Sequence, residues 1–439
     1  MIQNKGIENK VVKNASWIIV CKIVRAILSL VITMLTARYF GPSNFGIINY
    51  AAAVVAFAEP VMQLGLNNTL VRELINSPQN EGKILGTSIF MSFLSAIACI
   101  FGVFMFATIA ETGNTDSIIV CVLYSTCLLF QAVELIQYWF WSKYLSKYTS
   151  VTSLCAYFVV SLYKFYLLAT GKSIYWFALS NAFDFLIISV VLLRFYHKLG
   201  GQELKLSLSL GKQMFSKSHY YILATLMVTI FVQTDKVMIK LMIGSEANGF
   251  YSASVSAANM TGFVFAAIID SMRTAILEAH KENRIIFEKR MVTLYSVIIY
   301  CSLIQSMGMT LFSKYIITII YGANYIPAIS SLRIIVWCTT FAYLGAVRNI
   351  WILAKEKQKY LFPINFCGAL GNVLLNALLI PSMGIEGAAI ASLITQFFTN
   401  VIMGFMIKPI RPNNMLLVRG INPKYLLNVL KTIAPIKLL

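Results

Sequence analysis

Two stretches of the chain read almost alike: Gly41-Pro-Ser-Asn-Phe-Gly46-Ile-Ile-Asn-Tyr50-Ala51 and Gly244-Ser-Glu-Ala-Asn-Gly249-Phe-Tyr251-Ser-Ala253. In each stretch, two glycines five positions apart separate two long apolar segments, and an aromatic residue followed by small residues opens the second segment. A repeat of this kind is typical of transporters built from two like halves, which place the substrate path between the halves. The two stretches therefore predict a duplicated scaffold.

The composition places this scaffold in a bilayer. The 439 residues are 58% hydrophobic and 12% charged, whereas about a quarter of residues are charged in soluble proteins. Apolar runs of about 20 residues, long enough to cross a hydrocarbon core of ~30 Å as helices, are centred near residues 26, 56, 96, 129, 160, 185, 231, 262, 302, 341, 371 and 395. Long alternating strands of the barrel type are absent. We predict an all-α membrane protein with about 12 transmembrane helices.

The net charge of +19 reflects membrane topology rather than a nucleic-acid partner. When loops are assigned alternately to the two sides, most of the 36 Lys and Arg residues fall on one side, especially in the 194–217 and 273–290 loops. The positive-inside rule then predicts that both termini and the basic loops are cytoplasmic. The first apolar segment is too long for a signal-peptide core, so we expect it to remain as a helix. The eight cysteines lack metal-ligand spacing, and we predict no metal and no cofactor.

The largest cytoplasmic interruption divides the chain into six helices and six helices. We predict a first lobe over residues 1–198, a linker over 199–219, a second lobe over 220–408 and an amphipathic cytoplasmic tail over 409–439. Because each half has an even number of helices, both halves enter the membrane from the same side, and the two-fold axis runs along the membrane normal.

Ionisable residues inside the predicted helices need an explanation, since each costs about 2.5–3.5 kcal/mol on insertion scales. Lys22 and Arg25 are three residues apart and share one face of the first helix. Arg25 lies 13 residues before Arg38, and Glu59 lies 13 residues after Gly46. Both are thus about 20 Å from the same outer loop. We predict that Arg25 and Glu59 pair near mid-membrane, either structurally or in competition with an anionic substrate.

Other membrane-embedded charges occur in both halves. The fourth and sixth helices contain Glu134 and Asp184, and Asp235 and Lys236 follow in the seventh helix. An acidic group at this depth either binds a coupling proton or sodium ion or holds its neighbouring lysine charged. The remaining charges of interest are Asp270, Arg273 and Arg348.

Two positions are candidates for bending during transport. Pro60 removes a backbone hydrogen bond beside Glu59, and the matching position of the second half is near Gly262. A packing kink without motion is the alternative for both.

Several motifs along the chain form one set: Ala37-Arg-Tyr-Phe-Gly-Pro-Ser-Asn-Phe-Gly46 with Tyr50-Ala51, Leu64-Gly-Leu66, Leu70-Val-Arg-Glu73, Thr234-Asp-Lys236, Gly244 with Gly249-Phe-Tyr251, and Gly384-Ile-Glu-Gly-Ala-Ala-Ile-Ala-Ser392. With this set the chain resembles the polysaccharide transport family, the Wzx-type lipid-linked oligosaccharide flippases of the MOP superfamily. The resemblance covers roughly residues 12–406. It implies two six-helix lobes around a central cavity, as in MATE and MurJ proteins. It also implies movement of undecaprenyl-pyrophosphate-linked repeat units to the outer leaflet of a bacterial cytoplasmic membrane, for O-antigen, capsule or a similar polymer.

The resemblance also suggests site residues and partners. The candidate cations for the head group are Lys22, Arg25, Lys236, Arg273 and Arg348, and the candidates for ion coupling or ion pairs are Glu59, Asp235 and Asp270. The expected partners are the lipid-linked oligosaccharide, a proton or sodium ion, the lipid bilayer, and the polymerase and chain-length proteins of the same pathway.

Two other functions fit the sequence less well. A cation-coupled drug or metabolite antiporter of the same superfamily shares the fold, and a substrate assay separates it from a flippase. A membrane glycosyltransferase or polymerase needs a large outer loop with catalytic carboxylates, and the first outer loop, residues 38–44, contains no acid. We therefore predict a transporter and not an enzyme.

Overall fold

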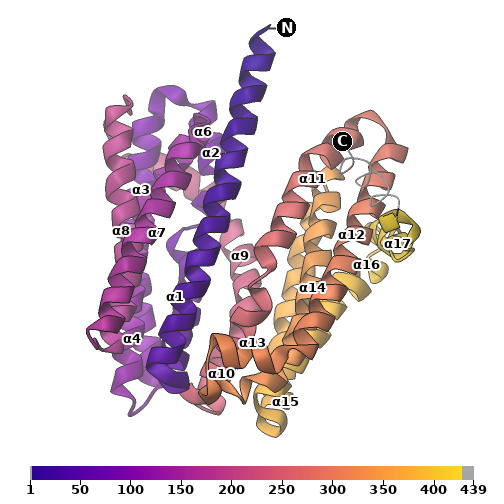
Figure 1. The fold of residues 1–439 in the computed structure, drawn as a ribbon. Coiled ribbons are helices and arrows are strands. Elements are labelled where there is room, and N and C mark those ends of the chain that lie inside the picture. Colours follow the sequence, from indigo (N-terminus) through magenta and orange to yellow (C-terminus); the bar gives the residue numbers. More distant parts are fainter. Residues whose placement is uncertain (1, 428–439) are drawn as a thin grey trace, which may run out of the picture. The chain divides into compact units, whose positions relative to one another are not determined.

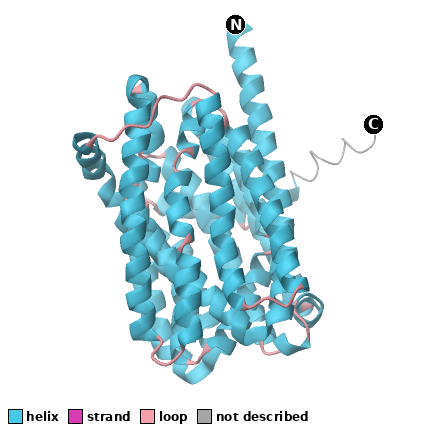
Figure 2. Cartoon of the chain, turned by 90° about the vertical axis from the view of Figure 1, so that its left-hand side faces the viewer, coloured by secondary structure: helices cyan, strands magenta, loops and turns pink. Residues whose placement is uncertain are grey.

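A computed structural model describes residues 2–427 of the chain, with the backbone alone for residues 2–19 and 68. Within these residues, every regular element is helical and none is a strand (Figure 2). Nine of the described helical ranges are long and apolar enough to cross a membrane, and a bent pair adds a tenth. The predicted all-α membrane fold is confirmed, and the chain is a multi-pass membrane protein.

Two of the nine ranges, Val20–Met62 and Gln358–Met406, are too long for one crossing. A continuous helix of 43 residues would extend about 65 Å, roughly twice the hydrocarbon thickness. Each range is divided by one glycine with a positive φ, 70° at Gly41 and 60° at Gly384, a conformation that glycine adopts without steric cost. If each divided range crosses twice and the bent pair once, the described residues make the twelve crossings that the sequence predicts.

Backbone contacts divide the chain into two compact units, Met1–Gly249 and Phe250–Leu439. The helices of the first unit, visible in Figure 1, are α1 (Ile2–Met62), α2 (Leu70–Asn76), α3 (Glu81–Ala110), α4 (Thr115–Ser125), α5 (Cys127–Glu134), α6 (Gln137–Ser142), α7 (Ser146–Ala169), α8 (Ile174–Lys198) and α9 (Leu208–Met242), with short 3₁₀ turns at Leu66–Asn68 and Pro78–Asn80. The helix α10 (Ser245–Asn259) begins at the end of this unit.

The described residues of the second unit form seven further α-helices. They are α11 (Gly262–Glu282), α12 (Arg284–Leu311), α13 (Ser313–Ile320), α14 (Ala328–Ala354), α15 (Leu361–Phe397), α16 (Met403–Met406) and α17 (Arg411–Gly420), with a π-helical turn at Phe398–Ile402 and 3₁₀ turns at Ala323–Tyr325 and Gln358–Tyr360. The apolar core of this unit lies mainly between α11, α12, α14 and α17. Part of the predicted amphipathic tail is α17, whose Leu416 and Leu417 are buried in this core; residues 428–439 lie outside the described range.

In the first unit, α1 packs on α7, α9 and α4. Small residues of its second half, Ala51 and Ala53, are fully buried beside Tyr50 and allow the helices to approach closely. Large apolar side chains such as Phe101 and Ile109 are exposed on the outside of the unit. This distribution is typical of a lipid-facing surface.

The two glycine stretches that resemble each other also touch each other, within the first unit. A Cβ atom added to Gly46 would lie 1.8 Å from the carbonyl oxygen of Ser245, and one added to Gly249 would lie 1.9 Å from that of Pro42. The Asn248 side chain donates a 2.8 Å hydrogen bond to the Gly46 carbonyl. The glycines are therefore required because two backbones approach within van der Waals distance here.

The predicted linker is in contact with the amino-terminal end of α3. Lys205 N donates to the Gly82 carbonyl at 3.2 Å, and Gly82 N donates to Gln202 Oε1 at 3.1 Å. A Cβ on Gly82 would lie 2.2 Å from the Glu203 carbonyl oxygen. The following helix, α9, packs on α1 and α3 and therefore belongs to the first compact unit. That residues 199–219 link two lobes which move relative to each other remains a prediction.

Candidate functional site

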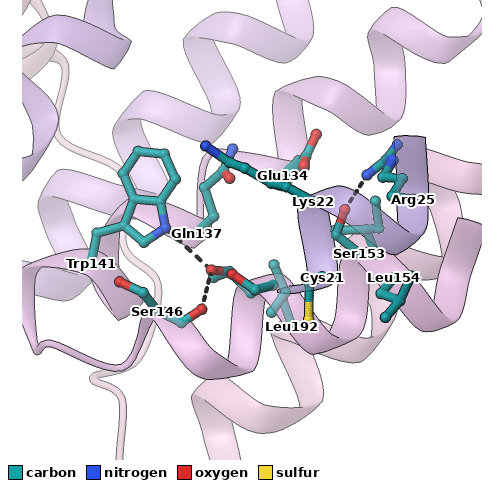
Figure 3. A pocket seen from close by; sticks show the side chains of 13 residues that line it. Cys21, Lys22, Arg25, Glu134, Gln137, Trp141, Ser146, Ser153, Leu154 and Leu192 are labelled. Carbon is teal, nitrogen blue, oxygen red and sulfur yellow. Dashed lines mark hydrogen bonds between the residues drawn. The ribbon is translucent and has the colours of Figure 1, made fainter. Parts of the chain in front are cut away.

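The first unit contains a cavity of about 610 Å³ between α1, α5, α6, α7 and α8. Figure 3 shows the side chains around it. The lining residues are mostly polar or charged: Cys21, Lys22, Arg25, Glu134, Gln137, Trp141, Ser146, Thr149, Ser150, Ser153, Leu154, Ile188 and Leu192. The structure thus brings together two predicted cations from α1 with polar groups from three other segments of the chain.

Arg25 is held on one side of the cavity by Asp184 of α8. Its Nη2 lies 2.8 Å from Asp184 Oδ2, and its Nη1 donates a hydrogen bond to Ser153 Oγ. The guanidinium also lies over the Tyr157 ring, 4.9 Å from the centroid. The Arg25 side chain is 34% exposed and that of Asp184 is 9% exposed. Arg25 is therefore oriented by three neighbours and still accessible from the cavity.

The predicted pairing of Arg25 with Glu59 is wrong. Glu59 Oε1 instead accepts a 3.0 Å hydrogen bond from Gln63 Nε2, and Gln63 Oε1 accepts one of 2.7 Å from Asn67. Counting residues from the outer loop gives the depth of a side chain but not the direction in which it points. The Arg25 side chain points toward α7 and α8, where Ser153 and Asp184 bind it.

Lys22 lies one helical turn before Arg25 on α1 and is exposed. Its side chain extends across the cavity toward the side that holds Gln137 and Trp141, while Arg25 lies at the opposite end beside Ser153 (Figure 3). Within the described residues, no carboxylate pairs with Lys22. The cavity therefore presents two cationic groups on one helix face, one paired and one available.

A stripe of hydroxyl groups on α7 was not singled out from the sequence. Ser146, Thr149, Ser150 and Ser153 follow the spacing i, i+3, i+4, i+7, which places them on one helix face. Thr149 Oγ1 accepts a 3.2 Å hydrogen bond from Trp141 Nε1 and donates one of 2.9 Å to the Ser146 carbonyl. The periodicity of small hydroxyl residues within an apolar segment was the available signal.

The charges predicted on α9 do not line this cavity. Asp235 is buried, and Lys236 Nζ donates a 3.1 Å hydrogen bond to Gln233 Oε1. Lys240 of the same helix forms a buried ion pair: its Nζ lies 2.8 Å from Glu111 Oε2 at the end of α3. Both side chains of this pair are almost fully buried, at 6% and 5% exposed. Sequence reasoning missed Glu111 because it directly follows an apolar helix and resembles a loop residue.

The cations predicted in the second unit have different surroundings. Arg273 pairs with Asp270 at 3.0 Å on the exposed surface of α11, at the predicted spacing of three residues. Arg348 is 4% exposed, and its Nη1 donates a 2.8 Å hydrogen bond to the Thr399 carbonyl in the π-helical turn. Arg348 thus binds the backbone of its own unit, and a role in head-group binding remains a prediction for both arginines.

The two hinge candidates lie next to helix breaks. Gly262 begins α11 after a break at which the axis bends by 41° from α10. Pro60 lies two residues before the end of α1, and Gly65 follows with a positive φ of 67°. Each candidate thus lies within a few residues of a helix break, and a bend at Pro60 and motion at either position remain predictions.

The chain has relatives among named proteins. It is 22% identical over 412 residues to a protein of Shigella flexneri named as an O-antigen transporter, covering 87% of this chain and 94% of that protein. It is also 22% identical over 395 residues to the capsular polysaccharide biosynthesis protein CapF of Staphylococcus aureus, with 88% and 96% covered.

Solved transporter structures share the fold. The lipid II flippase MurJ in an inward closed conformation superposes with a TM-score of 0.72 at 15% identity, over 93% of this chain and 92% of that chain. An inward-facing multidrug resistance MATE family transporter of the MOP superfamily gives 0.68 at 10% identity, over 89% and 95%. At these identities the match concerns the fold alone, and it confirms the MurJ-like and MATE-like architecture.

A family model described as a polysaccharide biosynthesis protein matches residues 11–276, which include the whole cavity and both glycine stretches. This match covers more than half of the chain. The chain is therefore a member of the polysaccharide biosynthesis protein family.

Proposed function

We propose that the protein is a flippase that moves a polyprenyl-pyrophosphate-linked oligosaccharide, in bacteria undecaprenyl-linked, from the inner to the outer leaflet of the cytoplasmic membrane. The observation that carries the proposal is the cavity of the first unit, in which Lys22 and Arg25 face amide, hydroxyl and indole groups. Family membership and the named relatives support it.

The chemistry of the cavity matches both parts of such a substrate. A pyrophosphate needs fixed cations, and a guanidinium binds phosphate oxygens in bidentate fashion. Sugar hydroxyls need hydrogen-bonding groups and aromatic faces, which Gln137, Trp141 and the α7 hydroxyls offer. A volume of about 610 Å³ accommodates the pyrophosphate and the adjoining sugar rather than a whole repeat unit.

The geometry of Arg25 suggests how an anionic head group enters. Because Arg25 is accessible from the cavity, a phosphate can replace Asp184 at the guanidinium without removing the other two neighbours, Ser153 and Tyr157. Arg25 thus exchanges one anion for another, and its charge stays compensated throughout.

Several further elements belong to the same proposal. Both termini are cytoplasmic by the lysine and arginine distribution. Two lobes alternate in access, and an ion gradient drives the cycle. The polymerase and chain-length proteins of the pathway receive the product. A transporter of this kind is not an enzyme and needs no bound cofactor.

A genetic complementation experiment tests the proposal. Arg25→Ala is expected to abolish surface polysaccharide in a host that depends on this protein, with the protein still present in the membrane, and Arg25→Lys is expected to restore it in part. The control is Arg284→Ala, because Arg284 also forms an ion pair but on an exposed helix surface. Normal polymer display by a well-expressed Arg25→Ala protein would exclude the cavity as the head-group site. If the wild type exports a fluorescent drug but moves no lipid-linked sugar, the antiporter alternative replaces the flippase.

A further inference from the structure

Glu134 is a carboxylate that lines the cavity without a partner. In the described part of the chain it forms no ion pair and no hydrogen bond, although it lies in a membrane-spanning segment. An unpaired charge at this position is costly, and a carboxylate that persists there needs a positive species to neutralise it. The cation Lys22 is on the same cavity wall but forms no ion pair with it.

Two further oxygen atoms near Glu134 lack donors. Gln131 Oε1 and Asp184 Oδ1 are buried and have no hydrogen-bond partner. Gln131 lies three residues before Glu134 and therefore on the same face of α5. A buried acceptor without a donor loses the hydrogen bonds that it makes with water and destabilises the fold. This part of the unit thus has more hydrogen-bond acceptors than donors. A proton or a metal cation would stabilise these oxygen atoms.

The backbone beside Glu134 changes its hydrogen-bond pattern. The helix α5 ends at Glu134, and α6 begins at Gln137. Between them, Ile136 N donates to the Val133 carbonyl and Tyr138 N donates to the Leu135 carbonyl, each at 3.2 Å, which is the pattern of a 3₁₀ turn. A 3₁₀ stretch inside a longer helix often marks a functional position.

The charged groups that act on Glu134 are Asp184, Arg25 and Glu59. Arg25 is bound to Asp184, and Glu59 is hydrogen-bonded to Gln63. No group of three or more Asp, Glu, His or Cys residues with metal-holding geometry exists among residues whose placement is described. The site therefore lacks the ligand set of a zinc or other transition-metal site.

We propose that Glu134 binds a monovalent cation, a proton or a sodium ion, together with Asp184, and that an anionic head group strengthens this binding. The inference rests on the proposed function. When a phosphate takes Arg25, Asp184 keeps Lys164 of α7 as a cationic neighbour, and Glu134 keeps none among the described residues. A cation shared by the two carboxylates restores the balance, so anion and cation favour each other's binding in a reciprocal way.

The test uses the purified full chain and inorganic pyrophosphate as the probe, without any lipid-linked sugar. Unfolding temperature is measured in sodium chloride and in choline chloride at matched ionic strength, with and without pyrophosphate. A sodium site predicts a sodium-dependent rise that pyrophosphate enlarges. A proton site predicts no sodium effect but a protonated-carboxyl infrared band that titrates with pH and persists to higher pH when pyrophosphate is present.

Glu134→Gln is expected to abolish whichever signal the wild type gives, and Glu203→Gln, an exposed acid in the linker, is expected to preserve it. If Glu134→Gln does not fold, Glu134→Asp is expected to retain the signal at a shifted midpoint, and Gln131→Leu to weaken it. A wild type without either signal, or a folded Glu134→Gln protein that keeps the full signal, would overturn the proposal. Because no oligosaccharide is used, failure here leaves the flippase proposal to its own genetic test.

Discussion

Two ion pairs of the first unit have the same length and opposite surroundings. Arg25–Asp184 and Lys240–Glu111 both measure 2.8 Å. The arginine of the first pair is 34% exposed and lines a cavity, whereas both members of the second pair are at most 6% exposed. The difference teaches that geometry alone does not make a membrane ion pair functional. Only the pair with access to a cavity can exchange its partner for a ligand.

The Lys240–Glu111 pair lies in the apolar core rather than at a cavity. Lys240 Nζ lies 5.7 Å from the centroid of the Tyr50 ring, and Tyr50 is fully buried in the core near the paired glycine stretches. The pair joins the end of α3 to the end of α9, a connection across 129 residues of sequence. It stabilises the contact between the two glycine stretches from within the core.

The largest expected effect follows from removing one member of the closed pair. Lys240→Met leaves Glu111 buried and uncompensated, and the expected loss of stability is about 3–5 kcal/mol. Thermal unfolding of the purified protein measures it. Arg25→Met is expected to lose less stability, because the Arg25 side chain is 34% exposed and the buried Asp184 keeps Lys164 as a second cationic neighbour.

The double variant Lys240→Met/Glu111→Leu provides the control for this prediction. Replacing both members of a buried pair by apolar residues of similar size is often neutral or stabilising, so most of the stability should return. If the double variant is as unstable as Lys240→Met, the lost free energy does not come from the unpaired Glu111 charge.

An intermediate effect is expected at the glycine contact. Gly46→Ala introduces a Cβ that would lie 1.8 Å from a backbone carbonyl oxygen, so the two helices must separate. Overpacking of this kind costs about 1–3 kcal/mol. Gly102→Ala on α3 is the matched control, because no atom lies within 4 Å of the added Cβ.

The unfolding temperatures of the two alanine variants give a direct comparison. Gly102→Ala is expected to leave stability unchanged or to raise it by up to about 1 kcal/mol, since alanine favours helix. Equal behaviour of the two variants would show that the close contact between the glycine stretches does not exist in the membrane.

The smallest effect is expected from Ser153→Ala. It removes one hydrogen bond from Arg25 but leaves the Asp184 pair and the Tyr157 ring in place. One such bond contributes about 0.5–1.5 kcal/mol, so transport should fall several-fold and not vanish. The measurement is the rate of polysaccharide display at equal protein level; a loss as complete as that of Arg25→Ala would make Ser153 a head-group ligand.

Much of the fold could be predicted from the sequence for simple reasons. The hydrocarbon thickness sets the length of an apolar segment, and a glycine with positive φ permits the break that divides a long range in two, as at Gly41 and Gly384. The two glycine stretches were visible as a repeat. That they touch each other was not, because like sequences predict like structures and do not predict contact between them.

The site could be predicted only in part. The sequence placed Lys22 and Arg25 on one face of a membrane helix, and both line the cavity. It paired Arg25 with Glu59, whereas the partner is Asp184, 159 residues away. Depth follows from counting residues at about 1.5 Å each, but the identity of a facing helix depends on how all the helices pack.

By itself, the sequence determined that this chain crosses a bilayer many times, that it contains two like glycine stretches, and that specific charges lie within the apolar segments, because length, composition and periodicity are local properties. The tertiary structure alone decided which of those charges meet. It exposed Arg25 and Glu134 to a cavity, enclosed Lys240 with Glu111, and placed Arg348 against a π-helical carbonyl. The physical reason is that side-chain contacts between distant segments depend on the relative rotation and register of packed helices, and no single helix contains that information.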